Sequence, residues 1–125
     1  MKIYVAGSII DQDLLRPIGA RLWALGHEIT GTWLHEHATS LPLNVESFNK
    51  KLAIKDIAEV QQADLLILDA RKSSGGKNVE WGLALGQFQH KSIWLVGEET
   101  NVFHYLADRK FVTWDECIDF LKGDK

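Results

Sequence analysis

The alternation of short apolar runs with helical segments constrains this chain more than any other feature of its sequence. Residues 63–70 (ADLLILDA) form the clearest run, and it is continuously apolar, as is typical of a strand covered on both faces. Four further strands are predicted, at residues 2–7, 27–34, 92–97 and 110–113. Strands that alternate with helices pair in parallel through right-handed crossovers. We therefore expect an α/β fold with a parallel five-stranded sheet between two helical layers, which is the Rossmann/flavodoxin-like three-layer sandwich.

Helical periodicity fills the stretches between the predicted strands. The first helix has apolar residues at helical spacing, namely Leu15, Ile18, Leu22 and Leu25. Its expected N-cap is Asp11 or Asp13, and Gly26 is the expected stop. With Asp13 as the cap, Pro17 stays in the first turn, where its missing N–H leaves no intrahelical bond unmade.

A second helix is expected to run from Asn44, its N-cap, to about Gln62. Its inner side is predicted to carry Val45, Phe48, Leu52, Ala53 and Ile57. Further helices are expected at residues 78–89, 101–108 and 114–122.

Composition limits the classes of protein to consider. With 125 residues, 46% of them hydrophobic, residues 1–125 suit one domain that needs no disulfide to fold. The single cysteine, Cys117, forms no internal bridge, which favours a reducing, cytoplasmic setting. The N-terminal apolar run is too short for a signal peptide or a membrane span. A net charge of −3 disfavours a nucleic acid polymer as a partner but leaves small nucleotides open.

The fold class also indicates where a site would lie. Ligands of open parallel sheets bind beyond the carboxyl ends of the strands, near the point where strand order reverses. The residues that this rule selects are Gly7-Ser8, Thr32-Trp33, 69–76 and Gly97 onward. A flat base often stacks on an aromatic ring, and Trp33 is a better candidate for this than Trp81, which we expect in the core.

Residues 73–82 (SSGGKNVEWG) are the most informative segment. The segment leaves a buried strand, turns on two glycines and is predicted to enter a helix whose first turn carries Glu80. Free amides at a helix N-terminus favour an anion and would hold Glu80 ionised. A glutamate that only complements the helix dipole gives the same pattern, so the residues alone leave both interpretations open.

Three segments, KIYVAGS, KDIAEVQQADLLILDA and SSGGKNVEWGLALG, resemble the signature blocks of the nucleoside 2-deoxyribosyltransferase family and its relatives, the deoxynucleoside monophosphate N-glycosidases. The resemblance covers most of the chain. It implies that Glu80 is a nucleophile that attacks an anomeric carbon and forms a glycosyl-enzyme ester. Residues 32–34 (TWL) and 101–104 (NVFH) are similar to a variant of this group carried by phages and bacteria.

The same resemblance implies roles for other residues. It makes Asp56 the proton-handling acid, because a nucleobase is a poor leaving group unless it is protonated. It places Tyr4 beside the nucleophile, and the Gly7-Ser8 turn against the sugar. Without the resemblance, Asp56 would be interpreted as a solvated helix residue and Tyr4 as a core residue.

The expected substrate contacts are Gly7, Ser8, Trp33, Asp69, Ser74, Gly76, Asn101 and His104. Ser74 stands where the hydrolase branch of the family has a serine and the transferases have an aspartate that grips the base. This favours hydrolysis, although Asp69 lies close by. The monophosphate hydrolases follow their Gly-Ser with a glycine- and arginine-rich loop, whereas residues 9–13 are IIDQD, with two aspartates that repel a phosphate. A nucleoside and a nucleotide both stay open.

Residues 97–104 (GEETNVFH) resemble the region in which family members lend residues to a neighbouring subunit's pocket. The resemblance implies this role for Asn101 and His104, and a homodimer or larger homo-oligomer with shared sites. From the residues alone, His104 would be an ordinary surface histidine.

The sequence thus predicts an enzyme, a nucleoside deoxyribosyltransferase or a nucleoside/nucleotide N-glycosidase. It would cleave or transfer at the N-glycosidic bond of a (deoxy)nucleoside or nucleotide through a covalent intermediate on Glu80. We expect no cofactor and no metal. Two alternatives stay open, a non-catalytic module that binds and sequesters a nucleotide, and an NAD-type glycohydrolase that uses the same glutamate chemistry.

Overall fold

The computed structural model describes residues 1–35, 45–71, 75–87 and 91–123. Its five strands are β1 (Lys2–Ala6), β2 (Glu28–Ile29), β3 (Leu65–Asp69), β4 (Ser92–Val96) and β5 (Arg109–Phe111). They pair in parallel throughout, in the order β2-β1-β3-β4-β5. This confirms the predicted α/β fold and its parallel five-stranded sheet. The strand order reverses between β1 and β3.

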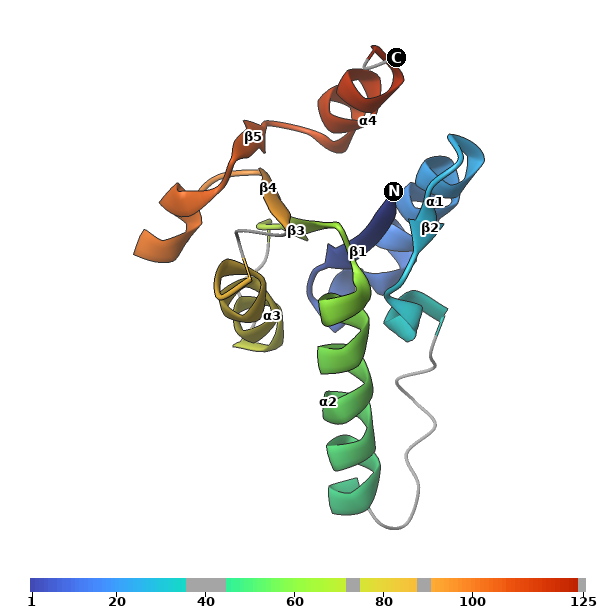
Figure 1. Ribbon diagram of the computed structural model, residues 1–125, viewed down its shortest axis with the longest axis vertical. Coiled ribbons are helices and arrows are strands. Elements are labelled where there is room, and N and C mark those ends of the chain that lie inside the picture. The colour runs from blue at the N-terminus through green and yellow to red at the C-terminus, as the bar shows by residue number, and fades with distance from the viewer. Residues whose placement is uncertain (36–44, 72–74, 88–90, 124–125) are drawn as a thin grey trace.

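Helices cover both faces of the sheet (Figure 1). The four α-helices are α1 (Gln12–Ala24), α2 (Val45–Gln62), α3 (Gly75–Leu85) and α4 (Trp114–Gly123). Helices α1 and α4 lie on one face and contact each other, and α2 and α3 do the same on the other face. Within the described ranges, short 3₁₀ helices join these elements, namely η1 (Ile9–Asp11), η2 (Thr32–His35) and η4 (Val102–Leu106).

Strand β3 is the centre of the core, and all five of its residues are buried, as its continuous apolar run predicted. Tyr4 on β1 is in register with Leu66 on β3. Side chains alternate along a strand, so Leu66 shares the α2/α3 face with Tyr4, whereas Asp69 points to the α1/α4 face. This alternation decides which of the candidate residues can meet.

The predicted strand at residues 27–34 is wrong beyond Ile29, because the chain turns into η2 at Thr32. The carboxylate of Glu59 on α2 accepts hydrogen bonds from the Thr32 amide at 3.1 Å and from its hydroxyl at 2.7 Å. The indole N–H of Trp33 donates to the carbonyl of Val5 at 2.8 Å. These side-chain contacts replace the ladder that a longer strand would have made.

Helix α1 begins at Gln12, directly after Asp11, so the alternative in which Asp13 is the cap is wrong. Pro17 consequently lies inside the helix rather than in its first turn, and it cannot bond the carbonyl of Asp13. The start is set upstream, because the Ser8 hydroxyl accepts from the backbone amide of Ile10 and begins η1, from which α1 continues.

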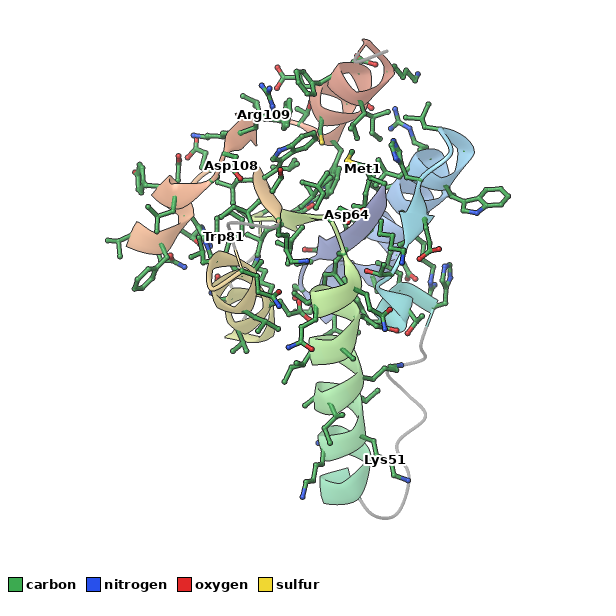
Figure 2. All side chains as sticks on the ribbon, in the orientation of Figure 1. Met1, Lys51, Asp64, Trp81, Asp108 and Arg109 are labelled. Atoms are coloured by element: carbon green, nitrogen blue, oxygen red, sulfur yellow. The ribbon has the colours of Figure 1, made fainter. Side chains whose placement is uncertain are left out.

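The predicted inner face of α2 is wrong at Ala53 and Ile57, which are exposed, whereas Glu59 and Val60 are buried. With 18 residues α2 is about 27 Å long, but strands of five residues span only about 17 Å. The first half of α2 therefore extends past the sheet, as Figures 1 and 2 show. The predicted cap Asn44 and the side chains of residues 45–48 lie outside the described part.

Helix α3 begins at Gly75, so the two glycines form its first turn and Glu80 lies in its second. The prediction that Glu80 occupies the first turn is therefore wrong. Glu80 is too far along α3 to receive hydrogen bonds from the free amides of the helix N-terminus. Its protonation is set instead by the side chains that surround it.

Candidate active site

Tyr4 and Glu80 form the centre of the candidate site. Tyr4 is fully buried on β1, and its hydroxyl donates to Oε2 of Glu80 at 2.5 Å. The pKa of Glu80 is raised to about 7: burial is the largest cause, the hydrogen bond from Tyr4 opposes it, and the charges of Asp56 and Glu59 add to it. The pKa of Tyr4 is raised well above its ordinary value, by burial first and by Glu80 second. Tyr4 therefore acts as a hydrogen-bond donor, and Glu80 changes charge near neutral pH.

Asp56 brings a second acid to the same place from α2. It is partly buried, and its Oδ1 is buried with no hydrogen-bond partner among the described residues. Burial raises the pKa of Asp56, the charge of Glu59 raises it further, and Lys55 opposes both. Its charge also raises the pKa of Tyr4 and of Glu80. A carboxyl group whose pKa is raised in this way holds its proton more strongly, which suits general acid catalysis.

Trp33 and the glycines around it form a wall of the site. Trp33 is 8% exposed, so only a small part of its ring is accessible. A Cβ on Gly31 would lie 3.1 Å from Tyr4 Cε2, and one on Gly7 would lie 2.4 Å from the Leu15 side chain. The backbone at both glycines therefore approaches neighbouring side chains too closely for a larger residue to fit without movement.

Ser8 and Gly76 lie at the rim as expected, but neither is shown to face Glu80. Ser8 is buried, and its hydroxyl starts η1. Gly76 is exposed, in the first turn of α3. Ser74 lies outside the described residues.

Asp69 lies on the other face of the sheet from Glu80. Arg71 contacts both of its carboxylate oxygens, and the indole of Trp114 donates to Oδ2 at 2.7 Å. Burial raises the pKa of Asp69, but the hydrogen bonds from Arg71 and Trp114 outweigh it and hold the pKa below its ordinary value. The structure thus places Asp69 as an ionised partner of Arg71 and α4, and does not bring it to the Tyr4–Glu80 pair.

His104 is fully buried, so its interpretation as a surface histidine is wrong. The Thr100 amide donates to its Nδ1 at 3.1 Å, so the neutral ring carries its proton on Nε2 and donates to Asn78 Oδ1 at 3.0 Å. Burial lowers the pKa of His104, and the charge of Lys77 lowers it further, against Glu99. The ring is therefore a neutral link between η4 and α3.

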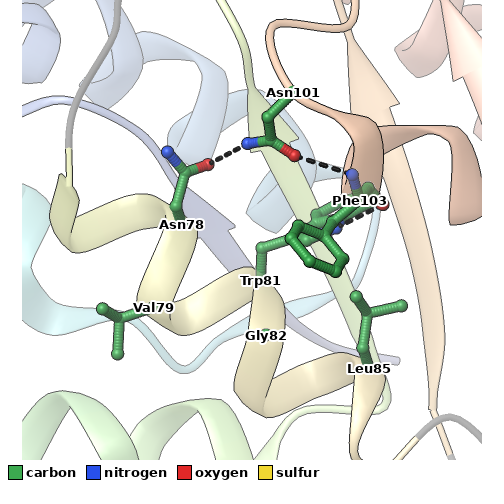
Figure 3. Close-up of a pocket in the computed structure, with 7 residues that line it drawn as sticks. All are labelled: Asn78, Val79, Trp81, Gly82, Leu85, Asn101 and Phe103. Atoms are coloured by element: carbon green, nitrogen blue, oxygen red, sulfur yellow. Dashed lines mark hydrogen bonds between the residues drawn. The ribbon is translucent and has the colours of Figure 1, made fainter.

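Asn101 completes this link (Figure 3). Its Oδ1 accepts from the Phe103 amide at 2.9 Å, and its Nδ2 lies 3.3 Å from Asn78 Oδ1. Trp81 is buried, as expected, and its indole donates to the carbonyl of Phe103 at 3.0 Å. Beside them lies a surface cavity of about 580 Å³, lined by Asn78, Val79, Trp81, Gly82, Leu85, Asn101 and Phe103. Glu80 does not line this cavity.

Among the described residues, no group of three or more His, Cys, Asp or Glu side chains could hold a metal ion. No helix within the described ranges is long and apolar enough to cross a membrane.

No family model matches the chain, and no curated protein matches it. Solved structures do. A conserved protein from Enterococcus faecalis has a TM-score of 0.73 at 15% identity, covering 100% of this chain and 99% of that one. The 2-deoxyribosyltransferase of Bacillus psychrosaccharolyticus has a TM-score of 0.70 at 18% identity, covering 95% and 91%. The CMP N-glycosidase BcmB of Clostridium botulinum has a TM-score of 0.62 at 17% identity, covering 98% of both chains.

The chain has a nucleoside 2-deoxyribosyltransferase-like fold. In this fold the strand order reverses between β1 and β3. Gly7 and Ser8 follow β1 directly, and Tyr4 extends from the middle of β1 to Glu80. The acidic cluster therefore lies on the α2/α3 face of the strands that flank the reversal point, close to the edge where ligands of open parallel sheets bind.

Three basic side chains in the described part of this edge, those of Arg71, Arg16 and Lys77, already have partners. Arg71 is paired with Asp69, and Arg16 with Asp13 at 2.7 Å. Lys77 is 1% exposed, and its Nζ donates to the carbonyl of Asp69 at 2.9 Å. Burial lowers the pKa of Lys77, and the charges of Asp69 and Asp11 oppose this. These three cations serve the protein's own carbonyl and carboxylate groups.

Glu59 is a candidate site residue that the sequence analysis missed, whereas its partner Thr32 was already among the residues expected at the rim. Glu59 is 9% exposed and accepts two hydrogen bonds from Thr32. The available signal was its spacing, because Glu59 follows Asp56 by three residues and so shares its face of α2. Its burial depends on where the chain turns after β2, and the predicted longer strand concealed that turn.

Proposed function

We propose that this protein cleaves the N-glycosidic bond of a (deoxy)nucleoside or nucleotide, with Glu80 as the nucleophile and Asp56 as the general acid. The observation that carries the proposal is the cluster itself. Tyr4 binds one oxygen of a partly buried Glu80 whose pKa is raised to about 7, and Asp56, with its raised pKa, acts on the same pair. The shared fold with a CMP N-glycosidase and a 2-deoxyribosyltransferase supports this class of reaction.

In the first step, Glu80 displaces the base. Because Tyr4 holds Oε2, we assign the attack to Oε1, which bonds to the anomeric carbon. The bond between that carbon and the base nitrogen breaks, its electron pair stays on the base, and the base takes a proton from Asp56. The products are the free base, an ionised Asp56 and a glycosyl ester of Glu80.

In the second step, the sugar leaves Glu80. A water molecule attacks the anomeric carbon and gives its proton to Asp56, while the ester bond breaks and its electron pair returns to Glu80. If an acceptor base takes the place of the water, the same step is a transfer. Two displacements at one carbon retain its configuration.

Among possible substrates we place a nucleoside before a 5′-monophosphate. After Ser8 the chain presents two exposed isoleucines, Ile9 and Ile10, and then the two aspartates Asp11 and Asp13. The nearest cation on α1, Arg16, is paired with Asp13. A phosphate dianion at this turn would meet negative charge rather than free cations.

The test is a panel of nucleosides, 5′-monophosphates and NAD, incubated with the wild type and with Glu80→Gln, with and without a free acceptor base, and separated by chromatography. We expect the wild type to release or exchange a base and Glu80→Gln to lose this activity. Exchange only in the presence of an acceptor identifies a transferase, and release into water identifies a hydrolase. No turnover, with thermal stabilisation by one compound, would replace the proposal with a nucleotide-binding module.

We further propose that the protein assembles as a homodimer or larger homo-oligomer through η4 and the cavity beside it. Val102, Phe103, Tyr105 and Leu106 on η4 are 59–74% exposed, and Phe103 and the exposed Val79 also line the cavity. An exposed apolar patch next to an open apolar cavity is typical of an association surface. Because Asn101 and His104 are bound to Asn78 of their own chain, they would shape this surface rather than reach far across it.

Sedimentation velocity tests this assembly. The wild type should sediment as a dimer or larger species at micromolar concentration, and Phe103→Ser should shift it toward the monomer. Trp23→Ser, which removes an exposed aromatic side chain from α1 on the other face, is the matched control and should leave the assembly unchanged. A wild type that is monomeric at every concentration would refute the proposal.

A further inference from the structure

The carboxylate of Glu59 is fixed on both sides although it takes no part in the steps above. Its Oε1 and Oε2 accept hydrogen bonds from the amide and the hydroxyl of Thr32, at 3.1 and 2.7 Å. Its backbone carbonyl accepts from the hydroxyl of Thr30 at 3.0 Å. Burying a charged group is unfavourable unless hydrogen bonds compensate, and here they do. This acid is fixed by hydrogen bonds beside Tyr4, Asp56 and Glu80, and a position of this kind indicates a role in the site.

The contact with Thr32 connects α2 to the wall of the site. Thr32 opens η2, and the next residue is Trp33, whose indole is anchored to β1. Gly31, just before Thr32, packs against the ring of Tyr4. Glu59 therefore links the helix that carries Asp56 to the segment that positions Trp33 and supports Tyr4.

The charge of Glu59 acts on the same cluster. The titratable groups on which this charge acts are Tyr4 from β1, Glu80 from α3 and Asp56 from its own helix. A negative charge on Glu59 raises the pKa of Tyr4, of Asp56 and of Glu80. Lys55 lowers the pKa of Asp56 and so opposes Glu59.

We propose that Glu59 is a positioning residue of this site, which fixes the Trp33 segment through Thr32 and places a carboxylate beside Asp56 and Glu80. The charge raises the pKa of Asp56, which favours its role as the acid, and the hydrogen bonds hold the wall against which the substrate packs. Its catalytic meaning rests on the proposed glycosidic reaction, whereas its electrostatic effect does not.

Glu59→Gln tests the charge, because it keeps the size of the side chain and an acceptor oxygen. The carboxyl groups of Asp56 and Glu80 are titrated by ¹³C NMR in the wild type and the variant. Without the charge of Glu59, both midpoints should move to lower pH by about one pH unit. Glu98→Gln, which removes an exposed charge after β4, is the matched control and should leave the midpoints in place. Unchanged midpoints in Glu59→Gln would refute the proposal.

Thr32→Val tests the link to Trp33 without altering the charge. On a nucleoside that the wild type converts, KM should rise several-fold while the pH profile of kcat/KM keeps its position, and Thr32→Ser should restore KM. Glu59→Gln should instead move the profile to lower pH. A lower melting temperature with KM and profile unchanged in both variants would leave Glu59 as a purely structural residue and overturn the proposal. If the wild type converts nothing, the reaction is refuted, and the NMR titration still decides the role of Glu59.

Discussion

Replacement of Glu80 by Gln should stabilise the folded protein at alkaline pH. Folding raises the pKa of Glu80 from an ordinary 4.5 to about 7, because burial disfavours the charged form. Between these two values the folded state keeps a proton that the unfolded state has lost, so the free energy of unfolding falls as pH rises through this window. A difference of 2.5 pH units corresponds to about 3 kcal/mol, most of which is lost between pH 5 and pH 8. A glutamine side chain does not ionise, so Glu80→Gln does not lose this stability as the pH rises.

Urea unfolding at pH 5 and pH 8 measures this effect. The stability of Glu80→Gln relative to the wild type should increase by roughly 2–3 kcal/mol between the two pH values. Glu98→Gln removes an exposed glutamate and is the control, which should follow the wild type at both pH values. If the Glu80→Gln and wild-type stabilities change in parallel with pH, Glu80 is not held in a desolvated environment, and the assignment of the nucleophile loses its physical basis.

Three further substitutions probe the same cluster through kcat/KM. Tyr4→Phe removes the hydrogen bond that lowers the pKa of Glu80, so kcat/KM at pH 7 should fall roughly 5- to 50-fold and the acidic limb of its pH profile should move to higher pH; a loss that leaves this limb in place would contradict the reasoning. Asp56→Asn should reduce turnover of natural nucleosides by about 10²- to 10⁴-fold but spare substrates with an activated leaving group, and equal losses for both would exclude Asp56 as the acid. Gly31→Ala places a methyl group 3.1 Å from the Tyr4 ring and should lower kcat/KM on the order of tenfold without loss of secondary structure by circular dichroism; unchanged activity would mean that the ring can shift freely.

At 15–18% identity, the solved structures establish the nucleoside 2-deoxyribosyltransferase-like fold. The reaction on this chain is argued from its own Tyr4, Asp56 and Glu80, and each substitution above tests one of these side chains or a contact that holds it in place.

Most of the fold could be predicted from the sequence because its signals are local. A continuous apolar run such as residues 65–69 indicates a strand buried on both faces. Helical spacing between such runs indicates helical crossovers, and these connect parallel strands. Local signals failed to predict the end of the second strand, where hydrogen bonds to distant residues replace backbone pairing between strands. Glu59 accepts a hydrogen bond from Thr32, and the carbonyl of Val5 accepts one from Trp33. These contacts end the second strand early, although Glu59 and Val5 lie far from residues 32–33 in the sequence.

The candidate residues divide in the same way. Tyr4 and Glu80 could be proposed from short sequence blocks, but only the paired strands bring them together across 76 positions. Asp69 lies in an equally suggestive stretch, yet the two-residue period of β3 turns its side chain to the other face of the sheet.

The sequence by itself therefore determined the type and order of the elements and the chemical groups available to a site. The protonation of those groups was decided by tertiary structure. Glu80 was expected to be held as an anion by a helix N-terminus, whereas burial among Tyr4, Asp56 and Glu59 raises its pKa toward neutrality. Desolvation and the proximity of like charges depend on the distances between segments far apart in the chain, and those distances exist only after the sheet has formed.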